Sequence, residues 1–73
     1  MNLIKLKDIM QTKNITAYQL AKKSGLSQSG VSYILNGKRK CTLESSVRIA
    51  NALKLTSKQI IDIFYKEDKW WNQ

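Results

Sequence analysis

Residues 15–39 read ITAYQLAKKSGLSQSGVSYILNGKR and contain two short amphipathic segments, each followed by a glycine. Thr16 and Gln19 have the spacing of a capping box, in which each side chain bonds the other residue's backbone amide. A helix is therefore expected to begin at Thr16. Gly25 stands where a helix-closing residue in the left-handed conformation is most often a glycine, so this helix is expected to end there.

A second helix is predicted to begin after Ser27, a favoured N-cap residue, and to run to about residue 36, with Gly37 as its closing residue. Its apolar side is formed by Val31, Ile34 and Leu35. On the opposite side, counting about 100° per residue, an uncharged hydrogen-bonding stripe spans an arc of roughly 140°. The members of this stripe are Gln28, Ser29, Ser32, Tyr33 and Asn36.

Outside these two segments the chain predicts three more helices. One covers about residues 2–13 and ends at Asn14, which tolerates the left-handed conformation. The others cover about 43–54 and 57–67, and the last opens with a second capping box of Thr56 and Gln59. In the helix over 43–54 the residues expected to face inward are Leu43, Val47, Ala50 and Leu53. The apolar residues of the last helix are Ile60, Ile61, Ile63 and Phe64.

No segment alternates with a period of two for long enough to form a strand. The sequence therefore predicts an all-α fold, a compact five-helix domain over residues 1–69, with a short C-terminal tail over 70–73. Trp70 and Trp71 in that tail either pack back on the fifth helix, join a partner chain, or remain without packing.

The composition of the 73 residues argues against an enzyme. There is no histidine, no pair of carboxylates and no glycine-rich phosphate loop, so we expect no catalytic residues, no metal ligands and no cofactor. Cys41 is the one cysteine and is expected to be an inert loop residue, with a redox sensor as the alternative. No apolar run approaches the roughly 18 residues of a membrane span, and the charged N-terminal segment does not resemble a signal peptide. We therefore expect a cytoplasmic protein.

Basic residues are concentrated in one part of the chain. The net charge is +8, from 13 basic and 5 acidic residues, and no acid occurs between Asp8 and Glu44. That window holds Lys13, Lys22, Lys23, Lys38, Arg39 and Lys40. A solvated basic face is one explanation of such a cluster; a surface that binds a polyanion is the other.

Two helices joined by a short turn with a central glycine form a helix-turn-helix, whose second helix enters the major groove of DNA. Here the sequence resembles the Cro/repressor-type (lambda-repressor-like, XRE) family of helix-turn-helix proteins. The matching residues are Thr16, Leu20, Ala21, Gly25, Ser27, Ser29, Val31, Ser32, Ile34, Asn36, Gly37 and Lys38. The resemblance continues through Leu43, Ala50 and Leu53 and covers roughly residues 3–64.

The resemblance implies where DNA would be contacted. Base-reading positions fall on Gln28, Ser29, Ser32 and Tyr33, and a glutamine can bond adenine through N6 and N7. Three roles remain open for Tyr33: contact with a phosphate, contact with a thymine methyl, or a surface position without a contact. Two explanations remain open for Gly30: close approach to DNA, or a glycine that is merely tolerated. Phosphate contacts are expected from the helix start at Thr16 and Ala17 and from the basic loop. The full set of candidate DNA-binding residues is Thr16, Ala17, Gln28, Ser29, Ser32, Tyr33, Asn36, Lys38, Arg39 and Lys40.

The sequence departs from the family at two places. Ala17 stands where many members have a glutamine that contacts phosphate, so their target preference cannot be transferred. Met10 and Leu35 occupy positions where many members pair an arginine with a glutamate. Because both partners are replaced together, no charge is left buried alone, and we predict that Met10 and Leu35 touch.

These features predict a transcriptional regulator, expected to be a repressor, that binds specific double-stranded DNA and acts as a homodimer. The candidate seam between the two copies consists of Ile61, Phe64, Tyr65, Trp70 and Trp71. The alternative is an antitoxin or adaptor, a protein-interaction module on the same fold whose basic face is incidental.

Overall fold

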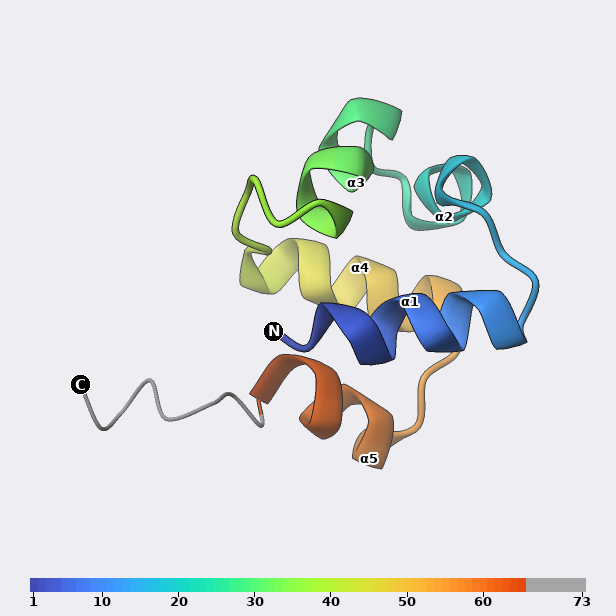
Figure 1. The fold of residues 1–73 in the computed structure, drawn as a ribbon, viewed down its shortest axis with the longest axis vertical. Helices are drawn as coiled ribbons and strands as arrows, with labels where there is room; N and C mark the ends of the chain where they lie inside the picture. Colours follow the sequence, from blue (N-terminus) through green and yellow to red (C-terminus); the bar gives the residue numbers. More distant parts are fainter. Residues whose placement is uncertain (66–73) are drawn as a thin grey trace.

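The computed structural model describes residues 1–65, and these form five α-helices and one π-helical turn without a β-strand (Figure 1). The elements are α1 (Leu3–Thr12), α2 (Ala17–Ser24), α3 (Gln28–Leu35), α4 (Leu43–Leu53), α5 (Ser57–Ile60) and the π-helical turn η1 (Ile61–Tyr65). Helices α1 and α4 cross the middle of the molecule, with α2 and α3 on one side of them and α5 on the other (Figure 1). The predicted all-α fold with five helices is confirmed.

Each helix begins at a polar residue whose side chain accepts a hydrogen bond from a backbone amide of the first turn. These residues are Asn2, Thr16, Ser27, Thr42 and Thr56. Both predicted capping boxes are complete, with donor–acceptor distances between 2.9 and 3.2 Å. The helix starts predicted at these boxes are therefore confirmed.

Four helices end at a residue in the left-handed conformation: Asn14 (φ 61°), Gly25 (75°), Gly37 (74°) and Lys54 (53°). After α1, α3 and α4, two backbone bonds run from the residues just beyond the helix to its last turn, the pattern of a Schellman motif. The first three ends were predicted. The left-handed Lys54 was not, because this conformation costs a residue with a side chain about 1–2 kcal/mol and lysine gives no sign of it.

The core combines residues of α1 to α4 with one residue of η1. Its members are Leu6, Ile9, Met10, Leu20, Ala21, Val31, Ile34, Leu35, Ile49, Leu53 and Ile63. Partly buried side chains that pack against it include Leu3, Ile15, Leu26 and Phe64.

Helix α4 buries Ala50 and Leu53 as predicted, but the rest of its inward side differs from the prediction. Leu43 and Val47, expected inside, are 68% and 50% exposed, and Ser46 and Ile49 are buried instead. Ser46 can be buried because its hydroxyl donates to the Leu43 carbonyl at 2.7 Å, so no polar group is left without a partner. The inward prediction for Leu43 and Val47 is therefore wrong.

The fifth helix also differs from its prediction. α5 ends at Ile60 and the chain widens into η1, where Ile61 is exposed and Ile63 is buried. The Ile63 carbonyl accepts a bond from the Asn2 amide at 2.7 Å, so the start of the chain supplies its partner. Lys5 Nζ lies 3.6 Å from Asp62 Oδ2 and adds a second tie between α1 and η1. The predicted continuation over 66–67, together with Trp70 and Trp71, lies outside the described residues.

Met10 and Leu35 are both buried and belong to the same core cluster. Neither position therefore has room for a hydrated charge. Their direct contact remains a prediction, which a single charged substitution tests.

Leu35→Glu is expected to lower the free energy of unfolding by at least about 3 kcal/mol, because its carboxylate would be buried without an arginine partner. Urea or thermal unfolding followed by circular dichroism measures this change. Leu43→Glu, on the exposed side of α4, is the matched control and is expected to stay within about 0.5 kcal/mol of the parent. A Leu35→Glu protein that melts at the parent temperature would contradict the burial of this residue.

Candidate nucleic-acid interface

Residues 25–27 connect α2 to α3. Gly25 has a φ of 75°, and a Cβ added to it would lie 3.0 Å from Arg48 Nη1, so both conformation and space favour glycine. The buried Ser24 hydroxyl donates to the Ala21 carbonyl and accepts from the Leu26 amide, each at 3.3 Å. These bonds join the end of α2 to the turn and fix the direction in which α3 leaves.

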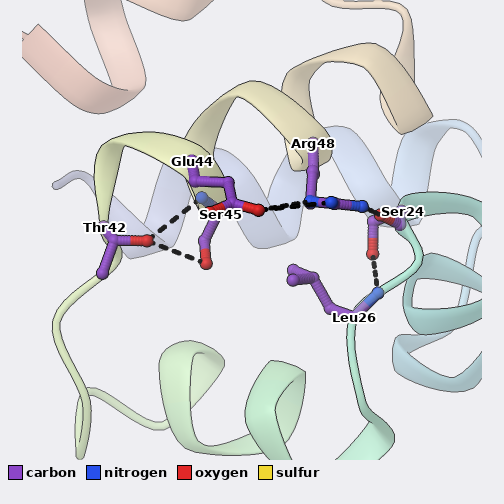
Figure 2. Close-up of polar contacts among 6 residues, drawn as sticks. All are labelled: Ser24, Leu26, Thr42, Glu44, Ser45 and Arg48. Carbon is purple, nitrogen blue, oxygen red and sulfur yellow. Dashed lines mark hydrogen bonds and ion pairs between the residues drawn. The ribbon is translucent and has the colours of Figure 1, made fainter.

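Arg48 of α4 also forms a hydrogen bond with this turn, at Ser24 (Figure 2). Its Nη1 donates to the Ser24 carbonyl at 3.3 Å, and its Nε donates to Glu44 Oε2 at 3.2 Å. A cation at the carbonyl end of α2 is favourable because the helix dipole is negative there. The Glu44–Arg48 spacing is visible in the sequence, but the bond to Ser24 joins residues 24 positions apart and carries no sequence signal.

Helix α3 turns one side to the core and the other to solvent, as predicted. Val31, Ile34 and Leu35 are buried. The exposed residues are Gln28, Ser29, Ser32, Tyr33 and Asn36, which is the whole predicted stripe. Asn36 Nδ2 donates to Ser32 Oγ at 3.4 Å, whereas Gln28 and Ser29 make no side-chain hydrogen bond within residues 1–65. Their polar groups are thus available to a ligand.

Gly30 lies outside this stripe and is buried. A Cβ on it would lie 2.8 Å from Ser27 Oγ, the atom that accepts the Gly30 amide and caps α3. The glycine therefore leaves room for the cap. Close approach of Gly30 to DNA stays a prediction, because in the free protein the Arg39 side chain lies beside this glycine.

The basic residues of the described chain differ in whether a carboxylate lies near them. Lys5 and Arg48 face carboxylates, at 3.6 and 3.2 Å. The six bases between Asp8 and Glu44 have no carboxylate within ion-pair distance among residues 1–65. Two of these six instead lie over aromatic rings, Lys22 over Tyr18 at 5.5 Å and Arg39 over Tyr33 at 5.4 Å. Within residues 1–65 the unpaired cations therefore include all six bases of the acid-free window between Asp8 and Glu44, together with Lys7, Lys54 and Lys58 elsewhere.

A short turn, a neutral exposed stripe on the second helix and unpaired cations around it are the features of a helix-turn-helix. A family model described as helix-turn-helix matches residues 6–60. The chain belongs to the helix-turn-helix family. This confirms the resemblance seen in the sequence and identifies a DNA-binding domain of the transcription-regulator type. Comparisons with curated proteins and with solved structures gave no match.

In a helix-turn-helix the first helix crosses the DNA backbone, and here that helix is α2. The Thr16 side chain accepts the amide of Gln19, which leaves the amides of Ala17 and Tyr18 at the open end of the helix. Ala17 is half-buried and packs against the core, so it can offer DNA its backbone amide but little side chain. Lys38, Arg39 and Lys40 are exposed in the loop after α3.

Cys41 follows the basic loop as a half-buried, free cysteine. Burial raises the pKa of its thiol, and the positive amino group of Met1 offsets this in part. A raised pKa leaves less of the reactive thiolate at neutral pH, which supports the expectation of an unreactive residue.

In the described part of the helix-turn-helix chain, no helix has the length and apolar character needed to cross a bilayer.

Arg48→Met is expected to lower the free energy of unfolding by about 1 kcal/mol, because the Ser24 carbonyl loses its charged donor. In a domain of this size that corresponds to a melting temperature lower by about 4–8 °C. Glu44→Gln is the control, since it removes only an exposed pair between residues i and i+4 and should cost less than about 0.5 kcal/mol. Equal losses in the two variants would show that Arg48 acts through Glu44 alone.

Proposed function

We propose that this chain is a transcription regulator that recognises a specific double-stranded DNA sequence, with α3 in the major groove. The observation that carries the proposal is the neutral, exposed stripe of α3 beside basic residues that have no carboxylate partner among residues 1–65. Neutral donors and acceptors can distinguish base edges, whereas cations around them bind phosphates of any sequence.

Base reading is assigned to the exposed side of α3. Gln28 lies in the first turn, the part of a recognition helix that reaches furthest toward the bases, and its amide can bond adenine N6 and N7 together. Ser29, Ser32 and Asn36 add short polar groups along the same stripe. The stripe carries no charge that would draw it toward phosphates in preference to bases.

Phosphate binding is assigned to two elements beside α3. The open amides at the start of α2 and the positive end of its dipole favour an anion. Lys38 and Lys40 supply charge where the chain leaves α3.

We further propose repression, because occupation of a DNA site is enough to exclude another protein from it. A DNA-binding role and the free thiol of Cys41 fit the cytoplasm.

Gln28→Ala is expected to weaken binding to the preferred site by about 1–3 kcal/mol and to relax discrimination at one base pair. Its effect on the dependence of affinity on salt should be small, since no charge is removed. Titration of labelled duplexes at several salt concentrations measures both quantities. Gln11→Ala, the same change at an exposed position of α1, is the control and should bind as the parent does.

Lys40→Ala should behave in the opposite way. It is expected to weaken binding to all sequences alike and to flatten the slope of log affinity against log salt by about 0.9, the value for one phosphate contact. Lys58→Ala, at the start of α5, removes the same charge away from the proposed surface and should leave the slope unchanged.

If Gln28→Ala lowered specific and random-sequence affinity by equal factors, α3 would not read bases through this residue. Absence of binding to any DNA would favour the antitoxin or adaptor alternative.

We propose in addition that the chain acts as a homodimer, because one recognition helix reads only a few base pairs and two copies read half-sites about 34 Å apart. Support comes from η1, where Ile61 and Tyr65 are 52% and 58% exposed. Phe64 is half-buried, and together with Tyr65, Leu3 and Leu43 it lines an open groove beside the basic loop. Exposed apolar side chains around a groove are typical of association surfaces.

Tyr65→Asp is expected to shift the dimer toward monomer, because a carboxylate would be desolvated in the seam. Sedimentation at several protein concentrations, with and without DNA, measures the assembly. Ile4→Asp on α1 is the control, since Ile4 is 83% exposed and lies outside the proposed seam. A parent protein that sediments as a monomer both free and on DNA would contradict the proposal.

A further inference from the structure

The Arg39 side chain lies along α3. Its Cζ is 5.4 Å from the centre of the Tyr33 ring. A Cβ built on Gly30 would lie 3.6 Å from Arg39 Nη1, which places the guanidinium one helical turn further toward the start of α3. Among residues 1–65 no carboxylate lies within ion-pair distance of Arg39, so its charge stays uncompensated.

The backbone after α3 directs Arg39 into this position. The Lys38 amide donates to the Tyr33 carbonyl at 2.9 Å, the Gly37 amide donates to the Ile34 carbonyl at 3.1 Å, and Gly37 is left-handed. These bonds turn the chain back toward the helix that it has just left. Because Gly30 has no side chain, the end of Arg39 can lie directly against the first turns of α3.

We propose that Tyr33 is a positioning residue that holds Arg39 beside α3, so that Arg39 reads a guanine together with the recognition helix. The proposal rests on the DNA-binding function proposed above. It moves Arg39 out of the group of loop cations that contact phosphates, where the sequence alone placed it, and gives the exposed ring of Tyr33 a definite role.

Geometry and chemistry both support this assignment. The Arg39 side chain makes no hydrogen bond within residues 1–65, so its N–H groups are available, and two N–H groups of a guanidinium match guanine O6 and N7. The guanidinium lies near Gly30, in the first turn of α3, and the first turn of a recognition helix is where base edges are contacted. The ring also restricts a long side chain before DNA arrives, which reduces the ordering cost of binding.

The first test uses the free protein and needs no DNA. A ring beneath the Arg39 side chain shifts its δ-CH₂ proton resonances upfield, and nuclear magnetic resonance measures this shift. We expect the shift in the parent and in Tyr33→Phe, which keeps the ring, and its loss in Tyr33→Leu. Unshifted Arg39 resonances in the parent would overturn the positioning role. Since Tyr33 is exposed, these variants are expected to keep the fold, which a thermal melt checks.

The second test measures base discrimination. A preferred duplex is selected from a random pool, and each of its base pairs is then changed in competition experiments. Arg39→Ala is expected to reduce the preference for one G·C pair by about 5- to 150-fold, the range for a lost bidentate contact. Tyr33→Leu should reduce the preference at the same pair by about 2- to 5-fold, the range for an exposed cation–π contact, and Tyr33→Phe should restore it. The double variant should be no worse than Arg39→Ala.

Lys58→Ala is the control, because it removes one positive charge at the start of α5, away from the proposed surface. It should leave the G·C preference unchanged. A uniform loss of affinity for all sequences in Arg39→Ala would overturn the proposal and return Arg39 to phosphate binding. An effect of Tyr33→Leu at a different base pair would also overturn it and assign Tyr33 a contact of its own. Failure of the parent to bind any duplex would contradict the proposed function and leave the resonance test to decide the role of Tyr33.

Discussion

The short turn between α2 and α3 forms because Gly25 adopts a φ of 75° and because hydrogen bonds hold the residues before and after it. The Ser24 hydroxyl bridges the end of α2 and the Leu26 amide, and Arg48 reaches from α4 to the Ser24 carbonyl. A side chain at position 25 would meet Arg48 and would also disfavour the left-handed backbone. The angle between the two helices depends on this junction.

Burial of small hydroxyl residues explains how so short a chain builds a core around this junction. Ser24 and Ser46 are both buried, and each donates to a carbonyl three residues earlier in its own helix. A serine whose hydroxyl is bonded in this way occupies little volume and leaves no polar group unsatisfied. Helix α4 can therefore bury Ser46 and leave Leu43 and Val47 at the surface, where Leu43 lines the groove beside η1.

Charged residues have two roles in this domain: some form ion pairs within the fold, and others are available to bind DNA. Outside residues 13–40, Lys5 of α1 pairs with Asp62 of η1, and Arg48 pairs with Glu44 within α4. The six bases of residues 13–40 have no carboxylate within ion-pair distance among residues 1–65, and Arg39 lies over an aromatic ring, which holds a cation without neutralising it. Charge of one sign over a limited surface attracts DNA from about a Debye length, roughly 10 Å at 0.1 M salt, while the neutral stripe of α3 leaves base reading to hydrogen bonds.

The sequence by itself determined where the helices begin and where most of them end, because caps such as Thr16 and closing residues such as Gly37 act on amides and carbonyls a few positions away. It also determined the exposed stripe of α3, since the helical period assigns each residue to a side. Only the tertiary structure decided that α4 buries Ser46 and Ile49 in place of Leu43 and Val47, that Arg48 bonds Ser24, and that Arg39 lies back over Tyr33. These outcomes depend on contacts between different segments: apolar residues at the edge of a helix are buried only if a neighbour covers them, and a long cationic side chain has many positions open to it until the surrounding fold selects one.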